Sequence, residues 1–332
     1  AASTRWRQRQ QSALHLMACL ARAIGWQAKL RTPRLGTELQ RRLGGRQWNC
    51  ARCCLTDLTI LGLCIRWATM EHSATLAMGG PAVYAALGAR LAGTNPILQL
   101  RLGCDVSPRE IEFIRSISRP SSTMERVDQR NLLWEGPTRV ALSGPGKVRG
   151  EPSSLSPVLV PDSSGVLAIA NMDPGAVTAA ALVWPRLVLV DLYESWIRYR
   201  PKSSIELARR ADVLFLTEQE LAAFSPSSQR DIVDAPDKFI VLKRGPQGVT
   251  LRYGGQHRQL PAASPERVLS DLGAGDLVLG FVAARLASRV KDDKRIDIND
   301  LESAYLEALP WIAQLLESPS PIDFLARQER LQ

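Results

Sequence analysis

The segment Ser270-Asp-Leu-Gly-Ala-Gly-Asp-Leu-Val-Leu-Gly-Phe281 carries the most specific pattern in this 332-residue sequence. Three small residues, Gly273, Ala274 and Gly275, precede Asp276, and an apolar helix is expected from that acid onward. Glycine lets the backbone turn tightly and approach a ligand closely. The free N–H groups at a helix start, together with the helix dipole, attract anions. The segment therefore predicts an anion-binding turn with a carboxylate beside it.

The carboxylate of Asp276 has two interpretations at this stage. At the start of a helix it is ordinarily a cap for the free amides. Beside a bound phosphate it can instead take the proton of an attacking hydroxyl, as phosphoryl transfer requires. A dinucleotide-binding turn is a further alternative, but such a turn opens a βαβ unit and has an acid about twenty residues later. Here that spacing leads to Asp297, in a Lys- and Asp-rich segment.

From about Leu58 onward, short apolar runs alternate with helical segments. The expected strands are Leu58–Gly62, Ile97–Leu102, Val166–Ile169, Leu187–Asp191, Val213–Leu216 and Phe239–Leu242, with a hairpin over 250–260. The expected helices are Pro81–Leu91, Asp276–Val290 and Asn299–Leu316. Strands interleaved with helices predict an α/β fold with a mostly parallel sheet covered on both faces. The site of such a sheet lies at the carboxyl ends of its strands.

The positive charge of the chain is concentrated at its N-terminus. Residues 1–55 hold eleven of the 42 Lys and Arg residues and one of the 33 Asp and Glu residues, which leaves a balance of 31 − 32 = −1 for residues 56–332. We therefore expect a basic extension over 1–55 and one α/β domain over 56–332. A nucleic-acid-binding fold would carry its basic residues along a structured face, so this partner is not favoured. No run of eighteen apolar residues is present, so no membrane partner is expected.

Three interpretations of residues 1–55 remain open. An Arg-rich, acid-poor N-terminus is typical of an organellar transit peptide. The segment could also be an accessory extension or a basic binding arm. The expected compartment is cytoplasmic, or organellar if the first interpretation holds. The six cysteines include one CxxC pair, Cys50 and Cys53, without a second pair at zinc-site spacing, so free thiols are expected rather than a metal site.

Ser270–Phe281 resembles the second signature of the ribokinase-like (PfkB) carbohydrate kinases, a Gly-Ala-Gly-Asp turn followed by an apolar helix. Other segments are similar to motifs of this family, in the same order along the chain. They are Met78–Gly93, Leu100–Asp105, Pro137–Arg139, Ala211–Glu220 and Lys243–Gly248. The resemblance covers about residues 58–330. It implies a ribokinase-like fold, a possible small β lid through which a homodimer could form, and the cofactors ATP and Mg²⁺.

At the phosphate end of the site, the resemblance implies that Asp276 is the general base. The amides of Gly273, Ala274 and Gly275 would hold the charge of the transferring phosphoryl group. Glu220 would help to organise Mg²⁺, although a plain helix acid is the alternative. The expected nucleotide-binding residues are Thr217, Glu220, Lys243, Gly245 and Gly248.

At the substrate end, Gly79 and Gly80 would act as a hinge and line the pocket, so that closure excludes water before transfer. Structural glycines at a helix start are the alternative for this pair. Arg139 is expected to contact substrate or phosphate, with a surface arginine as the alternative. The substrate would be a small molecule, a sugar, polyol or nucleoside.

The sequence also departs from the family pattern. The family places an Asp about five residues after the glycine of the first strand, where counting from Gly62 gives Arg66 and Trp67. An arginine cannot accept hydrogen bonds from sugar hydroxyls as a carboxylate does. Ser270 stands where the second signature begins with Asp, and Thr217 replaces an Asn. Two hypotheses follow: an active ATP-dependent kinase, or a non-catalytic relative that keeps the fold for a binding or structural role.

Overall fold

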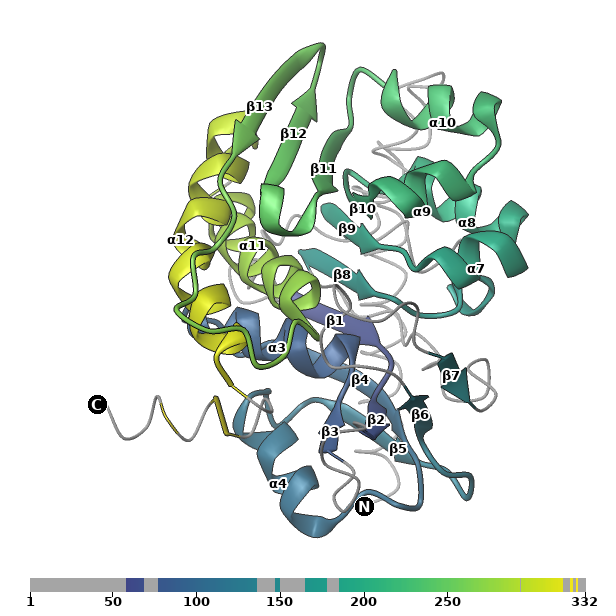
Figure 1. Cartoon of the computed structure of the whole chain (residues 1–332), viewed down its shortest axis with the longest axis vertical. Helices are drawn as coiled ribbons and strands as arrows, with labels where there is room; N and C mark the ends of the chain where they lie inside the picture. The colour runs from purple at the N-terminus through teal and green to yellow at the C-terminus, as the bar shows by residue number, and fades with distance from the viewer. Residues whose placement is uncertain are drawn as a thin grey trace, which may run out of the picture. The chain divides into compact units, whose positions relative to one another are not determined.

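In the computed structural model, a nine-stranded sheet forms the centre of the described residues, in the order β13-β12-β11-β10-β9-β8-β1-β4-β5 (Figure 1). The structure describes residues 58–68, 77–135, 147–149, 165–177, 185–292 and 294–318, with 323, 324 and 327. The chain divides into the units Ala1–Cys54 and Leu55–Gln332, and all described residues lie in the second. The expectations for the basic extension, the CxxC pair and Arg139 therefore lie outside the described residues.

The strands from β11 to β5 in this order are all parallel, and β12 and β13 add an antiparallel hairpin at one edge. Their bounds are β1 Leu58–Gly62, β4 Ile97–Leu102, β5 Thr123–Arg126, β8 Val166–Ala170, β9 Leu187–Asp191, β10 Val213–Thr217, β11 Phe239–Lys243, β12 Val249–Tyr253 and β13 Gln256–Leu260. Every residue of β1, β8 and β9 is buried, as expected of parallel strands covered on both faces. The expected α/β fold with a mostly parallel sheet is confirmed.

Two layers of helices cover the sheet, one on each face (Figure 1). One layer contains α3 (Pro81–Leu91), α4 (Pro108–Ser116), α11 (Ala274–Lys291) and α12 (Ile298–Leu316). The other contains α7 (Glu194–Tyr199), α8 (Pro201–Arg210), α9 (Glu218–Ala223) and α10 (Pro226–Val233). Each layer shares a separate hydrophobic core with its face of the sheet. No helix in this described part is both long enough and apolar enough to cross a membrane.

Glycines bring α3 and α11 into direct backbone contact. A Cβ atom on Gly280 of α11 would lie 1.7 Å from the carbonyl oxygen of Ala85, and one on Gly88 of α3 would lie 2.1 Å from that of Leu277. Side chains at these two positions would therefore force the helices apart. Because α3 is buried along Pro81–Ala89, this contact fixes the start of α11 over the sheet.

A small four-stranded sheet, in the order β3-β2-β6-β7, stands apart from the large one (Figure 1). Its strands are β2 Ile65–Ala68, β3 Ala77–Gly79, β6 Leu132–Glu135 and β7 Lys147–Arg149. β2 and β6 run parallel, and the outer pairs are antiparallel. This small sheet fits the lid that the resemblance implied.

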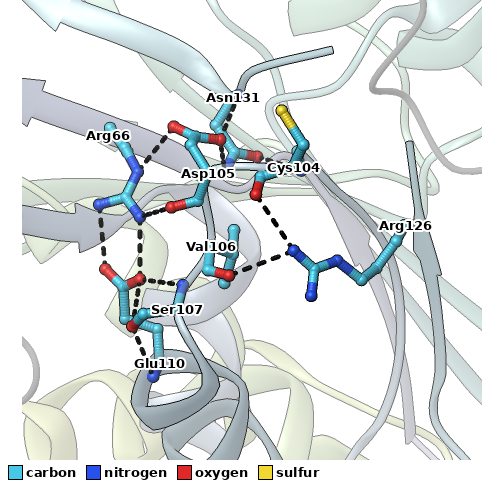
Figure 2. A network of polar contacts seen from close by, with 9 residues as sticks. Arg66, Cys104, Asp105, Val106, Ser107, Glu110, Arg126 and Asn131 are labelled. Atoms are coloured by element: carbon cyan, nitrogen blue, oxygen red, sulfur yellow. Dashed lines mark hydrogen bonds and ion pairs between the residues drawn. The ribbon is translucent and has the colours of Figure 1, made fainter. Parts of the chain in front are cut away.

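Arg66 of β2 ties the small sheet to the body of the molecule (Figure 2). Its Nε donates to Oδ2 of Asp105 at 2.8 Å, and its two terminal nitrogens donate to the carboxylate of Glu110 at 3.0 and 2.8 Å. Asp105 Oδ1 in turn accepts hydrogen bonds from the backbone and side-chain nitrogens of Asn131, at 2.9 and 3.1 Å. Because Asn131 directly precedes β6 and Glu110 lies in α4, the network joins two lid strands to a helix of the body.

Candidate active site

Four adjacent parallel strands deliver polar side chains to one edge of the large sheet. Asp191 is the last residue of β9, Thr217 of β10 and Lys243 of β11, and Asn171 directly follows β8. The pairings Ala170 with Asp191 and Thr217 with Lys243 place these strand ends level with one another. α11 begins at the same edge, since Asn171 Nδ2 donates to Asp276 Oδ1 at 3.0 Å.

The turn before α11 leaves its amides open. Gly273 is the N-cap and has φ +81, in the left-handed region that glycine tolerates. The helix hydrogen bonds start with Leu277, whose N–H donates to the Gly273 carbonyl at 2.8 Å. Within the described part of the chain, no acceptor binds the N–H groups of Gly273, Ala274 and Gly275. A helix start with open amides is able to hold an anion.

The ring of Tyr84 lies directly against this turn. A Cβ atom on Gly273 would lie 2.2 Å from the ring carbons Cγ and Cδ2 of Tyr84, so only glycine leaves room for the ring. Burial raises the pKa of the Tyr84 hydroxyl well above its usual value, and the charge of Asp276 adds to the effect. Tyr84 comes from α3, so the contact between α3 and α11 extends to the turn itself.

Asp276 occupies the third position of the first helical turn and is partly buried. Burial raises its pKa to about 7, and the negative charges of Asp191 and Glu220 act in the same direction. The ammonium of Lys243 and the hydrogen bond from Asn171 act in the opposite direction. A carboxylic acid with a pKa of about 7 can accept and release a proton near neutral pH, which suits a general base.

Lys243 and Asp191 form an ion pair in the centre of the site. Lys243 Nζ lies 2.7 Å from each carboxylate oxygen of Asp191, whose side chain is 1% exposed. Burial alone would lower the pKa of Lys243, but the carboxylates of Asp191 and Glu220 outweigh it, so the pKa lies above its usual value. Lys243 is therefore a fixed positive charge at the strand edge.

Glu220 caps the start of α9. The sequence alone could not decide between this structural role and a role in binding Mg²⁺. Its Oε2 accepts the backbone N–H of Thr217 at 2.6 Å, and the Thr217 hydroxyl accepts the N–H of Glu220 at 3.1 Å, which together form a capping box at the start of α9. Burial raises the pKa of Glu220 to about 7. Its other oxygen, Oε1, has no hydrogen bond or ion pair to any described residue.

The remaining predicted residues lie in turns around this edge. Gly245 and Gly248 have φ values of +54 and +84 in the turn from β11 to β12, where a Cβ atom on Gly248 would lie 2.0 Å from the Leu260 carbonyl oxygen. Gly79 ends the lid strand β3, and Gly80 caps α3 with φ +102. A Cβ atom on Gly80 would lie 2.6 Å from the backbone nitrogen of Ile65. The glycine pair therefore lies at the junction between the small sheet and the body.

The sequence analysis missed three residues of this site: Asn171, Asp191 and Tyr84. Asn171 and Asp191 carried a usable signal, because each is a polar residue at the end of a buried strand, and such ends meet at one edge of a parallel sheet. Tyr84 carried no signal, since an aromatic residue in an Ala-rich helix is typical of ordinary core.

These features define a protein with the ribokinase-like carbohydrate kinase fold: a parallel sheet, a small lid sheet and an open-amide turn that begins a buried helix. Residues 193–298 match the model of the pfkB family carbohydrate kinases. The resemblance to this family inferred from the sequence motifs is thereby confirmed over residues 193–298. No curated protein matches the chain in sequence.

Solved structures with the same fold cover most of this chain and nearly all of their own. Ribokinase from Cryptococcus neoformans var. grubii serotype A in complex with ADP has a TM-score of 0.57 and 17% identity, covering 83% of this chain and 99% of its own. Aminoimidazole riboside kinase from Salmonella enterica, with aminoimidazole riboside and an ATP analogue, has a TM-score of 0.59 and 14% identity, covering 81% and 99%. An E. coli structure assigned as ribokinase II, with ATP and Mg²⁺, has a TM-score of 0.60 and 12% identity, covering 82% and 100%.

Proposed function

We propose that this chain is an ATP-dependent kinase that phosphorylates a hydroxyl group of a sugar, polyol or nucleoside. The observation that carries the proposal is the pairing of open amides at the start of α11 with a carboxylate, Asp276, whose pKa is about 7. This pairing is what phosphoryl transfer asks of a protein: a place for the migrating charge and a base for the attacking alcohol. It also favours an active kinase over a non-catalytic relative.

In the proposed reaction, the acceptor hydroxyl gives its proton to Asp276 while its oxygen attacks the γ-phosphorus of ATP. A new P–O bond forms, the bond from the γ-phosphorus to the bridging oxygen breaks, and ADP leaves with that electron pair. The amides of Gly273, Ala274 and Gly275 hydrogen-bond the phosphoryl oxygens during transfer. Asn171 holds the Asp276 carboxylate in place by its 3.0 Å hydrogen bond. The proton on Asp276 is then released to solvent.

The nucleotide is proposed to lie over the ends of β10 and β11, in contact with Thr217, Lys243, Gly245 and Gly248. The ADP and ATP complexes of the structural relatives support a nucleotide as co-substrate. A Cβ atom on the left-handed Gly245 would meet nothing within 4 Å, so the turn leaves open space beside this residue. An adenine nucleotide could use that space without a rearrangement of the backbone.

Mg²⁺ is proposed to enter with ATP rather than to reside in the protein. No group of three metal-ligating His, Cys, Asp or Glu side chains exists among the described residues. Mg²⁺ commonly keeps several waters and binds through one or two carboxylates plus the phosphates of the substrate. The unpartnered Oε1 of Glu220 fits this mode. The ion would neutralise phosphate charge.

At the acceptor end, Gly79 and Gly80 are proposed to serve as the hinge of the lid, since they join β3 to α3. The riboside bound by the Salmonella enterica relative supports an acceptor with several hydroxyls. Arg66 is occupied by Asp105 and Glu110, so it is not proposed as a substrate ligand. The contact of Arg139 with substrate and the formation of a homodimer stay predictions from the resemblance.

Asp276→Asn tests the proposal. The amide keeps the shape of the side chain but cannot take a proton, so turnover of ATP with the best acceptor from a panel of sugars, polyols and nucleosides should fall by at least about 10²-fold. ADP release is measured in a coupled assay, with Asp231→Asn, an exposed acid that pairs with Arg209, as the control. Equal turnover in Asp276→Asn and the control would exclude Asp276 as the base.

A further inference from the structure

The ammonium of Lys243 is held in a fixed position, yet one of its donors is open. Both oxygens of Asp191 lie 2.7 Å from Nζ. A lysine ammonium has three N–H donors. Two of them are satisfied by Asp191, and no other described residue accepts from Lys243. The lysine side chain is 18% exposed while its partner is 1% exposed, so Lys243 is the more accessible member of the pair.

This ammonium lies beside the open amides of α11. A Cβ atom placed on Gly275 would lie 3.4 Å from Lys243 Nζ and 3.9 Å from Asp191 Oδ2, so the positive end of the pair is nearer to the turn. Gly275 has no side chain to separate the ammonium from the helix start. The same group of atoms therefore combines three backbone donors with one formal positive charge.

Asp191 is well placed to hold this charge still. It ends β9, which pairs with β8 on one side and β10 on the other, so its backbone is fixed within the sheet. A free lysine side chain rotates about four carbon–carbon bonds, and this freedom must be lost when the ammonium binds a phosphate. The double contact with Asp191 removes that freedom before the ligand arrives. Preorganised charge is worth most where charge develops in a transition state.

We propose that Lys243 is a catalytic residue that neutralises the transferring phosphoryl group beside the amides of Gly273–Gly275, and that Asp191 is the positioning residue that holds Lys243 there. This inference rests on the proposed kinase function and extends it. Lys243 would act on the phosphoryl group itself, beyond a general contact with the nucleotide. Asp191 would touch neither substrate nor nucleotide and would act through Lys243.

The pH dependence of kcat/KM offers a second measurement, because several charged groups around Asp276 influence its pKa. Asp191 from β9, Lys243 from β11 and Glu220 from α9 all influence Asp276, with Asn171 as its hydrogen-bond donor and Tyr84 of α3 beside it. Lys243 lowers the pKa of Asp276 and Asp191 raises it. Removal of the lysine charge should therefore move the acidic limb of kcat/KM to higher pH.

The test compares Lys243→Met, Lys243→Arg, Asp191→Asn and the double variant Asp191→Asn/Lys243→Met, with Asp231→Asn as the surface control. Lys243→Met should lower kcat by about 10²- to 10³-fold, the usual effect of removing one such donor. Lys243→Arg keeps the charge and should retain more activity than Lys243→Met. Asp191→Asn should lower kcat by roughly tenfold in the wild-type background. It should have no further effect on kcat in the Lys243→Met background, because the effects of two substitutions do not add when one residue acts through the other.

Thermal unfolding of each variant checks that it folds. If Asp191→Asn lowers kcat by the same factor in the wild-type and Lys243→Met backgrounds, the positioning role is wrong. If Lys243→Met keeps full kcat, the catalytic role is wrong.

Nucleotide binding separates this inference from the kinase proposal. In calorimetry, Lys243→Met should lower the affinity for a non-hydrolysable ATP analogue by a larger factor than the affinity for ADP. Only the ATP analogue would place a γ-phosphate beside Gly275. The binding difference can be measured even in a protein without acceptor turnover. An inactive wild type that shows it would overturn the kinase proposal and the catalytic role of Lys243, but not the contact of Lys243 with the γ-phosphate. Equal weakening of both nucleotides, or no binding of either by the wild type, would overturn the inference.

Discussion

At the residue scale, three carboxylates and one ammonium share the edge of the sheet, and their mutual influence sets the pH dependence of the site. Asp191, Glu220 and Asp276 outnumber Lys243, and all three acids have raised pKa values because burial penalises their charged forms. The pKa of Asp276 therefore lies close to neutral pH, so the carboxyl group can gain or lose a proton there.

The first residue-scale prediction concerns this titration. A general base works only in its deprotonated form, so kcat/KM should rise with pH and level off above the pKa of Asp276, about 7. A free aspartate would place the same limb near pH 4. The measurement is a pH profile of kcat/KM for the preferred acceptor, with unfolding monitored across the range. A profile that is flat between pH 5 and pH 8 would contradict the assignment.

The second residue-scale prediction concerns Gly273. Gly273→Ala introduces a side chain at φ +81, only 2.2 Å from the Tyr84 ring, so the turn or the ring must move. Gly93→Ala is a matched control, since its φ is +84 but nothing lies within 4 Å of the new methyl group. Gly93→Ala should lower the free energy of unfolding by about 1–2 kcal/mol from backbone strain alone. Gly273→Ala should lower the free energy of unfolding by at least about 1 kcal/mol more than the control, because the new methyl group overpacks the contact with Tyr84. Urea unfolding measures both, and equal losses would show that Tyr84 does not constrain the turn.

A site residue could be predicted from the sequence when its neighbours in the chain determine its position. It could not be predicted when its partner is distant in the sequence. Gly273, Ala274, Gly275 and Asp276 stand in one segment whose pattern predicts an anion-binding turn, and the structure places this segment at the sheet edge. The pairing of Asp191 with Lys243 joins positions 52 residues apart, and nothing in either local sequence specifies it. Glu220 could be read as a cap or a magnesium ligand, and the cap is formed.

At the element scale, the central strands and the long helices were predicted closely. Leu58–Gly62, Ile97–Leu102 and Leu187–Asp191 are strands with the predicted bounds, because short runs rich in apolar residues suit buried strands of a parallel sheet, even where Ile97–Leu102 includes Gln99 and Arg101. The strands of the small sheet were not predicted individually, since β2 and β3 have four and three residues. Such short strands depend on their partners rather than on their own sequence.

The element-scale prediction concerns the contact of α3 with α11. Gly280→Ala places a methyl group 1.7 Å from the Ala85 carbonyl oxygen, so the helices must separate. The expected loss of unfolding free energy is about 3 kcal/mol or more, because both helices are buried and neither can tilt freely. Arg285→Ala on the same helix removes an exposed ion pair with Glu307 and should cost under about 1 kcal/mol. Chemical denaturation compares the two, and a Gly280→Ala loss as small as that of the control would contradict the close contact.

At the scale of the whole molecule, the lid and the body are joined by charge as well as by chain connections. Arg66, Asp105 and Glu110 come from β2, the segment after β4 and α4, and Asn131 links them to the start of β6 (Figure 2). The sequence placed Arg66 where the resemblance called for a sugar-binding acid, and gave no indication of its partners. Arg66 holds the lid strands, so in the proposed reaction other residues would recognise the acceptor.

The whole-molecule prediction is that Arg66→Met loosens the lid before it unfolds the body. The substitution leaves the carboxylates of Asp105 and Glu110 without their guanidinium. Breaking a fully buried pair costs about 3–5 kcal/mol, and these partly buried carboxylates should cost less. Because β2 and the start of β6 lose their link to α4, hydrogen exchange should accelerate in the small sheet, while β8 and β9 keep their protection. Arg101→Met removes a more exposed pair with Glu125 and serves as the control. A uniform acceleration across both sheets would show that the network stabilises the entire fold rather than the attachment of the lid.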